Sequence, residues 1–362
     1  MTWYNNSWSY RKPVTISNSG SALTNYQVLV TVDTASLVTA GKLLSNCNDI
    51  RFTSSDGSTI INYWIESGCN TSSTKIWVKV PSIAASPTTT TIYMYYKNAG
   101  ASAASSGTGT FDFYDDFSSN SNGWSSTGGI GVSGGRLGGT YGLNGYHSGI
   151  SRSIGDNWVF YFDFIYVSSS NQSNGGRVGF ASSINDTSSI SDCIDTDLYC
   201  NSGTSPVNLN LHVAKGGNIY YAYGTTINLS LNTQYYMKWI FNSSSGTTLY
   251  VYSDAARTSL FGSVTISAAN LPTVSALTNF ISAVWGGGIN GSGVSWSDNW
   301  RIAKYASTPP TVSSPGTEEA MPCNTPSANL VVLEIVSSQL LRQYPSYIDI
   351  YAISRLIEMR NL

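Results

Sequence analysis

Most of the chain alternates between apolar and polar positions with a period of two, which predicts β-strands. Residues 25–33 place Tyr and Val at every second position, and in residues 75–80 Ile and Val alternate with outward lysines. Residues 207–213 alternate without a break, so we expect His212 on the solvated face with Asn208 and Asn210. Further strands are expected at 91–96, 157–167, 234–242, 248–254 and 279–285, with a short helix at 35–44.

Gly-rich turns separate the predicted strands, and no strand–helix–strand repeat occurs, so we expect an all-β protein of two tandem β-sandwich or jelly-roll domains. The first domain covers residues 1–110 and ends in a segment rich in Ala, Ser and Gly. A larger jelly roll covers residues 111–306, and a Pro- and Ser-rich linker follows at 307–317. Residues 318–362 contain no Gly and are rich in Leu, Ile and Val. We expect this segment either to mediate assembly by strand addition to a neighbouring subunit or to pack on its own domain.

Composition narrows the classes of function. Of the 362 residues only 10% are charged and the net charge is −2. No basic cluster exceeds Arg11 and Lys12, so we expect no nucleic-acid partner. A hydrophobic content of 41%, with 24 Tyr and 10 Trp, excludes intrinsic disorder. The polar remainder is Ser, Thr, Asn and Gly, which resembles surface and extracellular β proteins.

The N-terminal residues lack the basic and apolar regions of a secretory leader. No run approaches the roughly 18 apolar residues that a membrane helix needs. We therefore expect no membrane insertion. The protein would either have lost a leader or leave the cell without one, as virion proteins released by lysis do.

Four of the five cysteines form two pairs that are local in sequence. Cys47 and Cys69 lie in the first domain, and Cys193 and Cys200 lie in the second. A Cys47–Cys69 bridge would stabilise the fold by about 3 kcal/mol in the chain-entropy model. Buried free thiols are the alternative for both pairs until the compartment is known. The absence of a Cys-x-x-Cys spacing argues against structural zinc.

The first domain resembles a known family through several separated motifs. They are Trp-Ser-Tyr-Arg-Lys-Pro-Val-Thr-Ile at 8–16, Asp-Ile-Arg-Phe at 49–52, Ser-Asp-Gly at 55–57, Tyr-Trp-Ile-Glu at 63–66 and Ile-Trp-Val-Lys-Val-Pro at 76–81. In this order they resemble domain of unknown function 2341, a module of bacterial and archaeal surface proteins. The resemblance covers about the first 115 residues. That family has no established catalytic activity, so the resemblance implies no catalytic residue.

The second domain is similar to laminin-G-like, concanavalin-type jelly rolls at its first and last strands. The matching segments are Phe-Tyr-Asp-Asp-Phe at 113–117, Val-Ser-Gly-Gly-Arg-Leu at 132–137 and Ser-Asp-Asn-Trp-Arg-Ile at 297–302. This similarity implies a two-sheet sandwich of a kind used for glycan binding, adhesion or structure.

The distribution of acids and histidines argues against catalysis. Glycosidases need two carboxylates beside the scissile bond, and hydrolases of this fold usually place two glutamates on one strand, spaced by two. The second domain contains no Glu. Asp195 and Asp197 have that spacing, but we expect them in a loop between cysteines. Serine catalysis needs a His base, and the chain has only His147, in a loop with no companion acid nearby, and His212, on the solvated face. We expect no enzyme.

Two loops offer binding chemistry. Aromatic rings stack on sugars while amides bind hydroxyls, so we expect a glycan site that draws on Tyr141, Asn144, Tyr146, His147 and Trp285. The alternative for each aromatic ring is ordinary cross-strand packing. Asp192, Asp195 and Asp197 lie within six residues and are either calcium ligands or three solvated acids near a disulfide turn.

Together these features predict a non-enzymatic structural surface protein of a larger assembly. The setting we favour is a phage or virion fibre, tail or capsid-decoration protein whose jelly roll presents a face to host glycans. Its partners would be copies of itself or other subunits of the particle, and it would lie on the virion surface. The alternative is a secreted or cell-surface glycan-binding adhesin. A third hypothesis is a glycoside hydrolase that uses aspartates.

Overall fold

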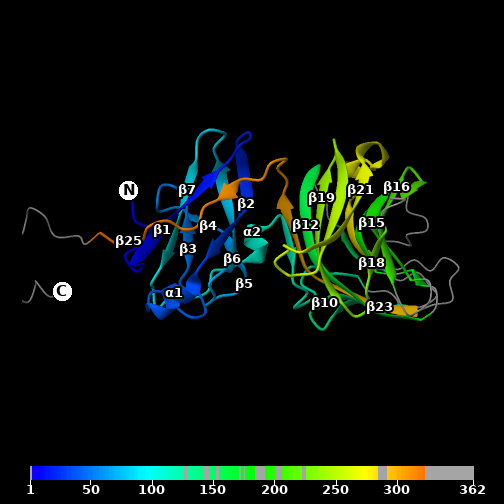
Figure 1. Ribbon diagram of the computed structural model, residues 1–362, viewed down its shortest axis with the longest axis horizontal. Coiled ribbons are helices and arrows are strands. Elements are labelled where there is room, and N and C mark those ends of the chain that lie inside the picture. The colour runs from blue at the N-terminus through cyan, green and yellow to red at the C-terminus, as the bar shows by residue number, and fades with distance from the viewer. Residues whose placement is uncertain are drawn as a thin grey trace, which may run out of the picture. The chain divides into compact units, whose positions relative to one another are not determined.

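The computed structural model describes residues 2–125, 129–141, 147–151, 155–170, 173–174, 176–183, 192–200, 206–221, 226–283 and 292–322. At 141, 147, 148, 169, 170, 173, 174, 199, 200, 220, 221, 283 and 292 the backbone alone is described. The chain divides into two compact units, residues 1–319 and 320–362. The first unit is all-β, as predicted, and contains two sandwiches with separate hydrophobic cores (Figure 1).

The first sandwich packs a sheet of order β24-β1-β7-β3-β4 against a sheet of order β2-β6-β5. The strands are β1 (Tyr10–Ser17), β2 (Leu23–Val32), β3 (Arg51–Thr53), β4 (Ile60–Ile61), β5 (Tyr63–Ser67), β6 (Thr74–Ile83), β7 (Thr90–Tyr96) and β24 (Thr311–Val312). The period of two holds: Val28 and Val30 of β2 and Ile76 and Val78 of β6 are buried in the core. The helix α1 (Thr34–Thr39) is shorter than the predicted 35–44.

A disulfide joins Cys47 and Cys69 in the first sandwich, with Cα atoms 6.1 Å apart. Cys47 follows α1 and Cys69 follows β5, so the bridge ties the chain between helix and sheet to the edge of the smaller sheet. The pairing predicted from sequence proximity is therefore present.

The jelly roll consists of two further antiparallel sheets. One has the order β21-β20-β19-β12-β23-β10-β9, with β8 paired to β23. Its strands are β8 (Phe113–Asp115), β9 (Ile130–Ser133), β10 (Arg136–Tyr141), β12 (Asn157–Ser170), β19 (Gln234–Asn242), β20 (Gly246–Tyr252), β21 (Leu260–Ser267) and β23 (Ser292–Lys304). The rings of Trp158, Phe160, Trp239 and Trp300 are buried between the sheets and form much of the core.

The second sheet of the jelly roll, called the outer sheet below, has the order β11-β22-β14-β15-β16-β17, with β13 paired to β15 and β18 to β16. Its strands are β11 (His147–Ser151), β13 (Ser173–Asn174), β14 (Arg177–Ala181), β15 (Cys193–Cys200), β16 (Val207–Lys215), β17 (Asn218–Tyr221), β18 (Ile227–Leu229) and β22 (Asn279–Ala283). The remaining short elements are α2 (Gly107–Thr110), the 3-10 turns Ala268–Asn270 and Val274–Ala276, and β25 (Glu319–Ala320).

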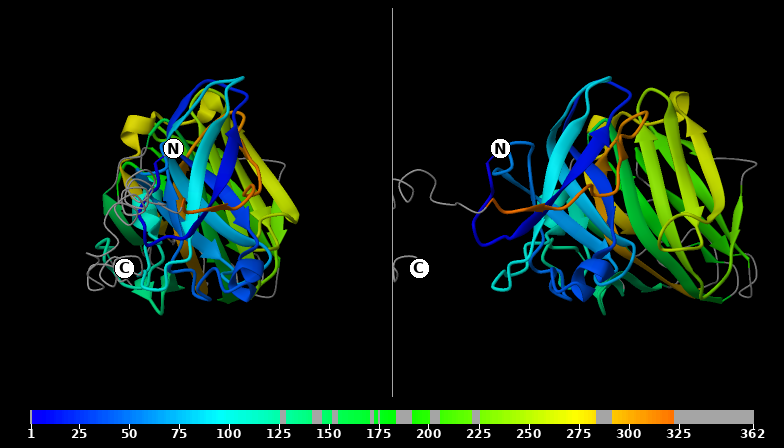
Figure 2. Two further views of the ribbon diagram at one scale, coloured as in Figure 1. Left: turned by 90° about the vertical axis from the view of Figure 1, so that its left-hand side faces the viewer. Right: turned by 60° about the vertical axis from the view of Figure 1, so that its left-hand side comes forward.

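The prediction that 307–317 is a simple linker is wrong, because this segment returns to the first sandwich and pairs with it (Figure 2). β24 pairs with β1, and Val312 packs on the first core. The amide of Gly316 donates to the carbonyl of Pro13 at 2.7 Å. Two acids then follow: Glu318 forms an ion pair with Lys42, and Glu319 one with Arg11. The jelly roll is thus inserted within the first sandwich, and only 323–362 of the predicted assembly segment lies outside the described residues.

The two sandwiches share an aromatic and charged junction. Trp77, Phe111 and Ala303 are buried together there. Glu66 accepts from Arg301 of β23, and Asp163 of β12 accepts from Arg257 at 2.8 Å. The Ala-, Ser- and Gly-rich end of the first domain therefore leads into a packed interface, not a free hinge.

Candidate functional site

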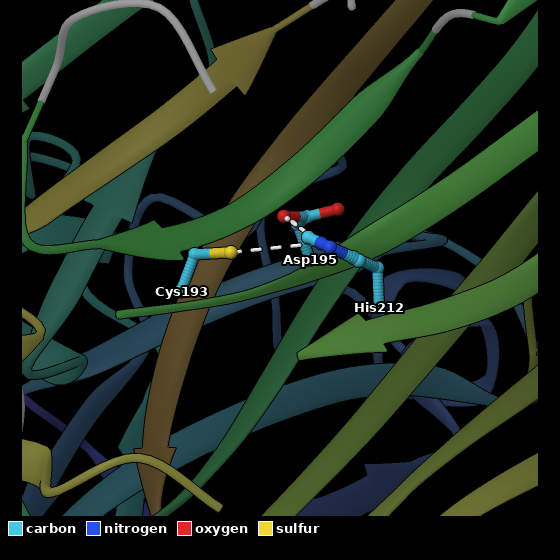
Figure 3. A group of neighbouring side chains, drawn as sticks. All are labelled: Cys193, Asp195 and His212. Atoms are coloured by element: carbon cyan, nitrogen blue, oxygen red, sulfur yellow. Dashed lines mark hydrogen bonds and ion pairs between the residues drawn. The ribbon is translucent and has the colours of Figure 1, made fainter. Parts of the chain in front are cut away.

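The outward face of the outer sheet carries a row of polar side chains on β15. Ile194 and Leu198 point into the core, so Cys193, Asp195 and Asp197 occupy the opposite face by the period of two. In the antiparallel register Asp195 lies opposite His212 of β16, and residues opposite each other share a face. The strand pairing thereby brings a thiol, a carboxylate and an imidazole together (Figure 3).

His212 is buried, with only 3% of its surface exposed, so the predicted solvated side chain is wrong. Its Nδ1 lies 3.1 Å from Asp195 Oδ2 and 3.5 Å from Cys193 Sγ. The polar pattern placed His212 on the correct face of β16. That face is covered at His212, whereas Asn208 and Asn210 remain half-buried.

Arg177, at the start of β14, joins this cluster from the neighbouring strand. Its Nη2 donates to Asp197 Oδ1 at 3.0 Å, and its Nη1 lies 3.5 Å from Asp195 Oδ1 and 3.2 Å from His212 Nδ1. Gly179 lies two residues after Arg177 on β14, and a Cβ there would lie 2.2 Å from the Ile194 carbonyl oxygen. No larger residue fits at that position between β14 and β15.

The cluster does not form a nucleophilic triad. A triad places the nucleophile and the acid on opposite nitrogens of the imidazole, whereas Cys193 and Asp195 both face Nδ1 of His212. Burial raises the pKa of the Cys193 thiol, and the Asp195 carboxylate adds to the rise. A reactive cysteine needs the opposite shift.

Asp195 and Asp197 also lack the arrangement of a glycosidase pair. They lie on a strand, not in the expected loop, so their spacing does place both on one face. Burial acts to raise the pKa of Asp195, but the charge of Arg177 and the interactions with His212 and Cys193 outweigh it and lower that pKa below its usual value. A general acid needs a raised pKa, and Arg177 contacts both carboxylates.

The three aspartates predicted as calcium ligands do not form an oxygen cage. Asp192 precedes β15 and accepts from the Gly216 amide at 3.2 Å, while Asp195 and Asp197 are paired with Arg177. A guanidinium occupies the space between carboxylates that a calcium ion would need. Calcium binding therefore stays a prediction without assigned ligands.

The predicted Cys193–Cys200 bridge is wrong. The two residues begin and end one eight-residue strand, which places their Cα atoms roughly 23 Å apart. A disulfide requires Cα atoms within about 7 Å of each other. Cys193 is a buried free thiol.

Of the predicted glycan residues, the structure places the backbone of two, one on each sheet of the jelly roll. Tyr141 ends β10 and His147 begins β11, while Asn144, Tyr146 and Trp285 lie outside the described residues. His147 pairs in register with Ala283, the last residue of β22 before the loop that contains Trp285.

The same register extends to the polar cluster. Ala283 also pairs with Arg177, so the residue that follows the first predicted loop and the residue that precedes the second lie in one row with Arg177. The strand pairing thus brings the bases of both predicted loops beside a charged residue that the sequence reasoning did not single out.

A second polar site lies at the junction of the sandwiches, where a cavity of about 500 Å³ is lined by Trp64, Tyr236, Glu66, Arg257 and Arg301, among others. The sequence reasoning missed it, because its residues come from strands far apart in the chain. For the cluster on β15 a signal was present: apolar Ile194 and Leu198 alternate with polar residues from 193 to 197.

No helix among the described residues has the length and apolar character needed to cross a membrane. No curated protein sequence matches the chain. Solved structures with weak similarity cover about half of it.

One such structure comes from work on endo-acting O-glycanases that prominent members of the human gut microbiota express to initiate mucin breakdown. It has 12% identity, a TM-score of 0.38 and coverage of 54% of this chain and 100% of its own. The carbohydrate-binding module CBM66 from Bacillus subtilis has 11% identity, a TM-score of 0.30 and coverage of 51% and 96%. A legume lectin-like domain from Entamoeba histolytica has 9% identity, a TM-score of 0.37 and coverage of 51% and 90%.

The family match covers part of the first sandwich and continues past β8 of the jelly roll. Several of the motifs at 49–81 lie within the matched region, whereas the motif at 8–16 precedes it. Residues 46–127 match the family described as Domain of unknown function (DUF2341), which confirms the resemblance over that stretch.

Proposed function

We propose that the chain is a non-catalytic, glycan-binding surface protein whose sugar site lies on the outward face of the outer sheet. The observation that carries this proposal is the register His147–Ala283–Arg177, which brings one flanking residue of each of two aromatic, Gly-rich segments into a row with a buried charge. Recognition residues are concentrated on loops that a rigid scaffold positions. Two recognition loops beside one end of a rigid sheet would fit this principle.

The face supplies the chemistry that a sugar requires. Asn208 and Asn210 are half-buried and lie on the same face as Asp197, with Asn210 directly opposite it. Amides donate hydrogen bonds to hydroxyl groups and accept them, and carboxylates accept them. The rings of Tyr141, Tyr146 and Trp285 are the proposed stacking partners.

An extracellular location is supported by the Cys47–Cys69 disulfide, because such bridges persist in oxidising compartments. A lack of catalysis is supported by the pairing of Asp195 and Asp197 with Arg177. The virion setting, the partner subunits and the assembly role of 318–362 stay predictions, as does the adhesin alternative.

The test is binding of the intact protein to a broad glycan array. Trp285→Ala and Asn210→Ala should each weaken binding at least about tenfold, the loss of one good contact. Thr265→Ala is the matched control, since its hydroxyl lies on an exposed face of the other sheet, 3.0 Å from Thr248 Oγ1. Absence of any bound glycan, or equal binding by all variants, would contradict the proposal. Release of reducing sugar would instead favour the hydrolase hypothesis.

A further inference from the structure

The buried cluster of Cys193, Asp195 and His212 has the dimensions of a metal site. One ligand atom from each residue lies within 4.8 Å of the other two. Sγ is 3.5 Å from Nδ1, and Nδ1 is 3.1 Å from Asp195 Oδ2. In a tetrahedral zinc site with ordinary bond lengths, neighbouring sulfur and nitrogen ligands lie about 3.5 Å apart, and nitrogen and oxygen about 3.3 Å.

Hydrogen bonding alone leaves a conflict at His212 Nδ1. Asp195 Oδ2 can only accept, so it needs a proton on Nδ1, whereas Arg177 Nη1 can only donate and needs the lone pair of the same atom. One nitrogen meets only one of these demands. Asp195 Oδ1 is in addition buried and accepts no hydrogen bond among the described residues. A cation that takes lone pairs from sulfur, nitrogen and oxygen removes the need for a proton on Nδ1, and Arg177 Nη1 then has Asp195 Oδ1, 3.5 Å away, as its acceptor.

The charges also balance with a divalent ion. With a neutral thiol and a neutral imidazole, Asp195, Asp197 and Arg177 sum to one negative charge in a buried place. A divalent cation bound to the Cys193 thiolate, whose proton passes to solvent, brings the sum to zero. Arg177 can remain paired with Asp197 Oδ1, because the metal would bind Oδ2 of Asp195 and no atom of Asp197.

We propose that Cys193, Asp195 and His212 bind a zinc-type transition-metal ion. Calcium and magnesium prefer oxygen ligands only, whereas thiolate, imidazole and carboxylate together suit zinc. Three protein ligands are the number found in zinc sites that leave a fourth position open. The sequence shows no zinc motif, because these ligands come from two paired strands and have no Cys-x-x-Cys spacing.

Cobalt(II) is the probe for the site, tested on the full-length chain without an affinity tag. After dialysis against Co²⁺ and removal of free ion, we expect one cobalt per chain by elemental analysis. A thiolate-to-cobalt charge-transfer band and strong visible bands would report tetrahedral coordination, and Zn²⁺ should displace them. Cys193→Ser should abolish the charge-transfer band. Cys200→Ser, at the other end of the same strand, should retain it.

A second measurement keeps the proposal testable if Cys193→Ser does not fold. For the unaltered chain, Zn²⁺ should raise the melting temperature and a chelator should lower it, while Mg²⁺ at the same concentration should have no effect. Substoichiometric cobalt in well-folded protein would overturn the proposal. A charge-transfer band that survives in Cys193→Ser would do so as well.

Discussion

At the scale of single residues, Arg177 organises the outward face of the outer sheet. It is 3% exposed and contacts Asp195 and Asp197, which project from the neighbouring strand at positions two apart. Burying two carboxylates is costly unless a cation compensates them. The guanidinium therefore stabilises this face by compensating the charge of the two carboxylates.

Arg177→Met should destabilise the jelly roll by about 3–5 kcal/mol, because removal of one partner leaves buried charge uncompensated. Urea unfolding followed by Trp fluorescence measures this loss. Arg136→Met is the control, since Arg136 is exposed on β10. A loss no larger than that of the control would mean that the two acids are solvated in solution.

At the scale of elements, β12 and β23 bring two acids together. Asp163 and Asp298 are cross-strand neighbours in register, and like charges directly opposite are destabilising. Arg257 and Asn299 bind the Asp163 carboxylate, while Asp298 accepts from the Asn299 amide. Burial raises the pKa of Asp298 to about 6, and Asp163 adds to the rise.

This pKa sets a pH dependence of stability. A carboxyl whose pKa is higher in the folded state than in the unfolded state favours folding as it takes up its proton. The free energy of unfolding should therefore rise as the pH falls from 7 towards 5. Asp298→Asn should raise the stability at pH 7 and flatten the dependence, as followed by urea unfolding at both pH values. Asp156→Asn, at an exposed position, should leave the slope unchanged; an identical slope in Asp298→Asn would refute the assignment.

The strands show how much of the fold can be predicted from the sequence alone. The period of two located β2, β6, β16 and β19 because each buries one face of apolar side chains. β15 was taken for a loop because its outward face holds a thiol and two acids, and their compensation by Arg177 comes from another strand. β24 was taken for linker because its two residues are stabilised by pairing with β1, some 300 residues earlier in the chain.

At the scale of the whole molecule, the returning segment completes the first sandwich. β24 covers the edge of β1, and Glu319 pairs with Arg11, which is buried against the rings of Trp3 and Tyr93. Open edges of sheets promote association with other chains. The stability of the first sandwich therefore depends on residues beyond the jelly roll.

A chain truncated after residue 306 should lose stability in the first sandwich and aggregate, whereas one truncated after residue 322 should fold like the full chain. Thermal unfolding and light scattering compare the two. If both behave alike, β24 and the two glutamates contribute nothing to the fold. The chain truncated after residue 322 also tests the predicted assembly segment, because it lacks 323–362 and keeps both sandwiches complete.

The insertion places the points of entry and exit of the jelly roll side by side. The buried Gln27 amide accepts from the Lys304 backbone and donates to the Thr110 carbonyl, and the Asp112 amide donates to the Ile302 carbonyl. The two sandwiches are consequently not connected in series. A pulling force that enters at Thr110 and leaves at Lys304 is carried across this short bridge, and the jelly roll bears none of it until the bridge breaks. A proteolytic cut in one connection likewise leaves both parts joined by the other.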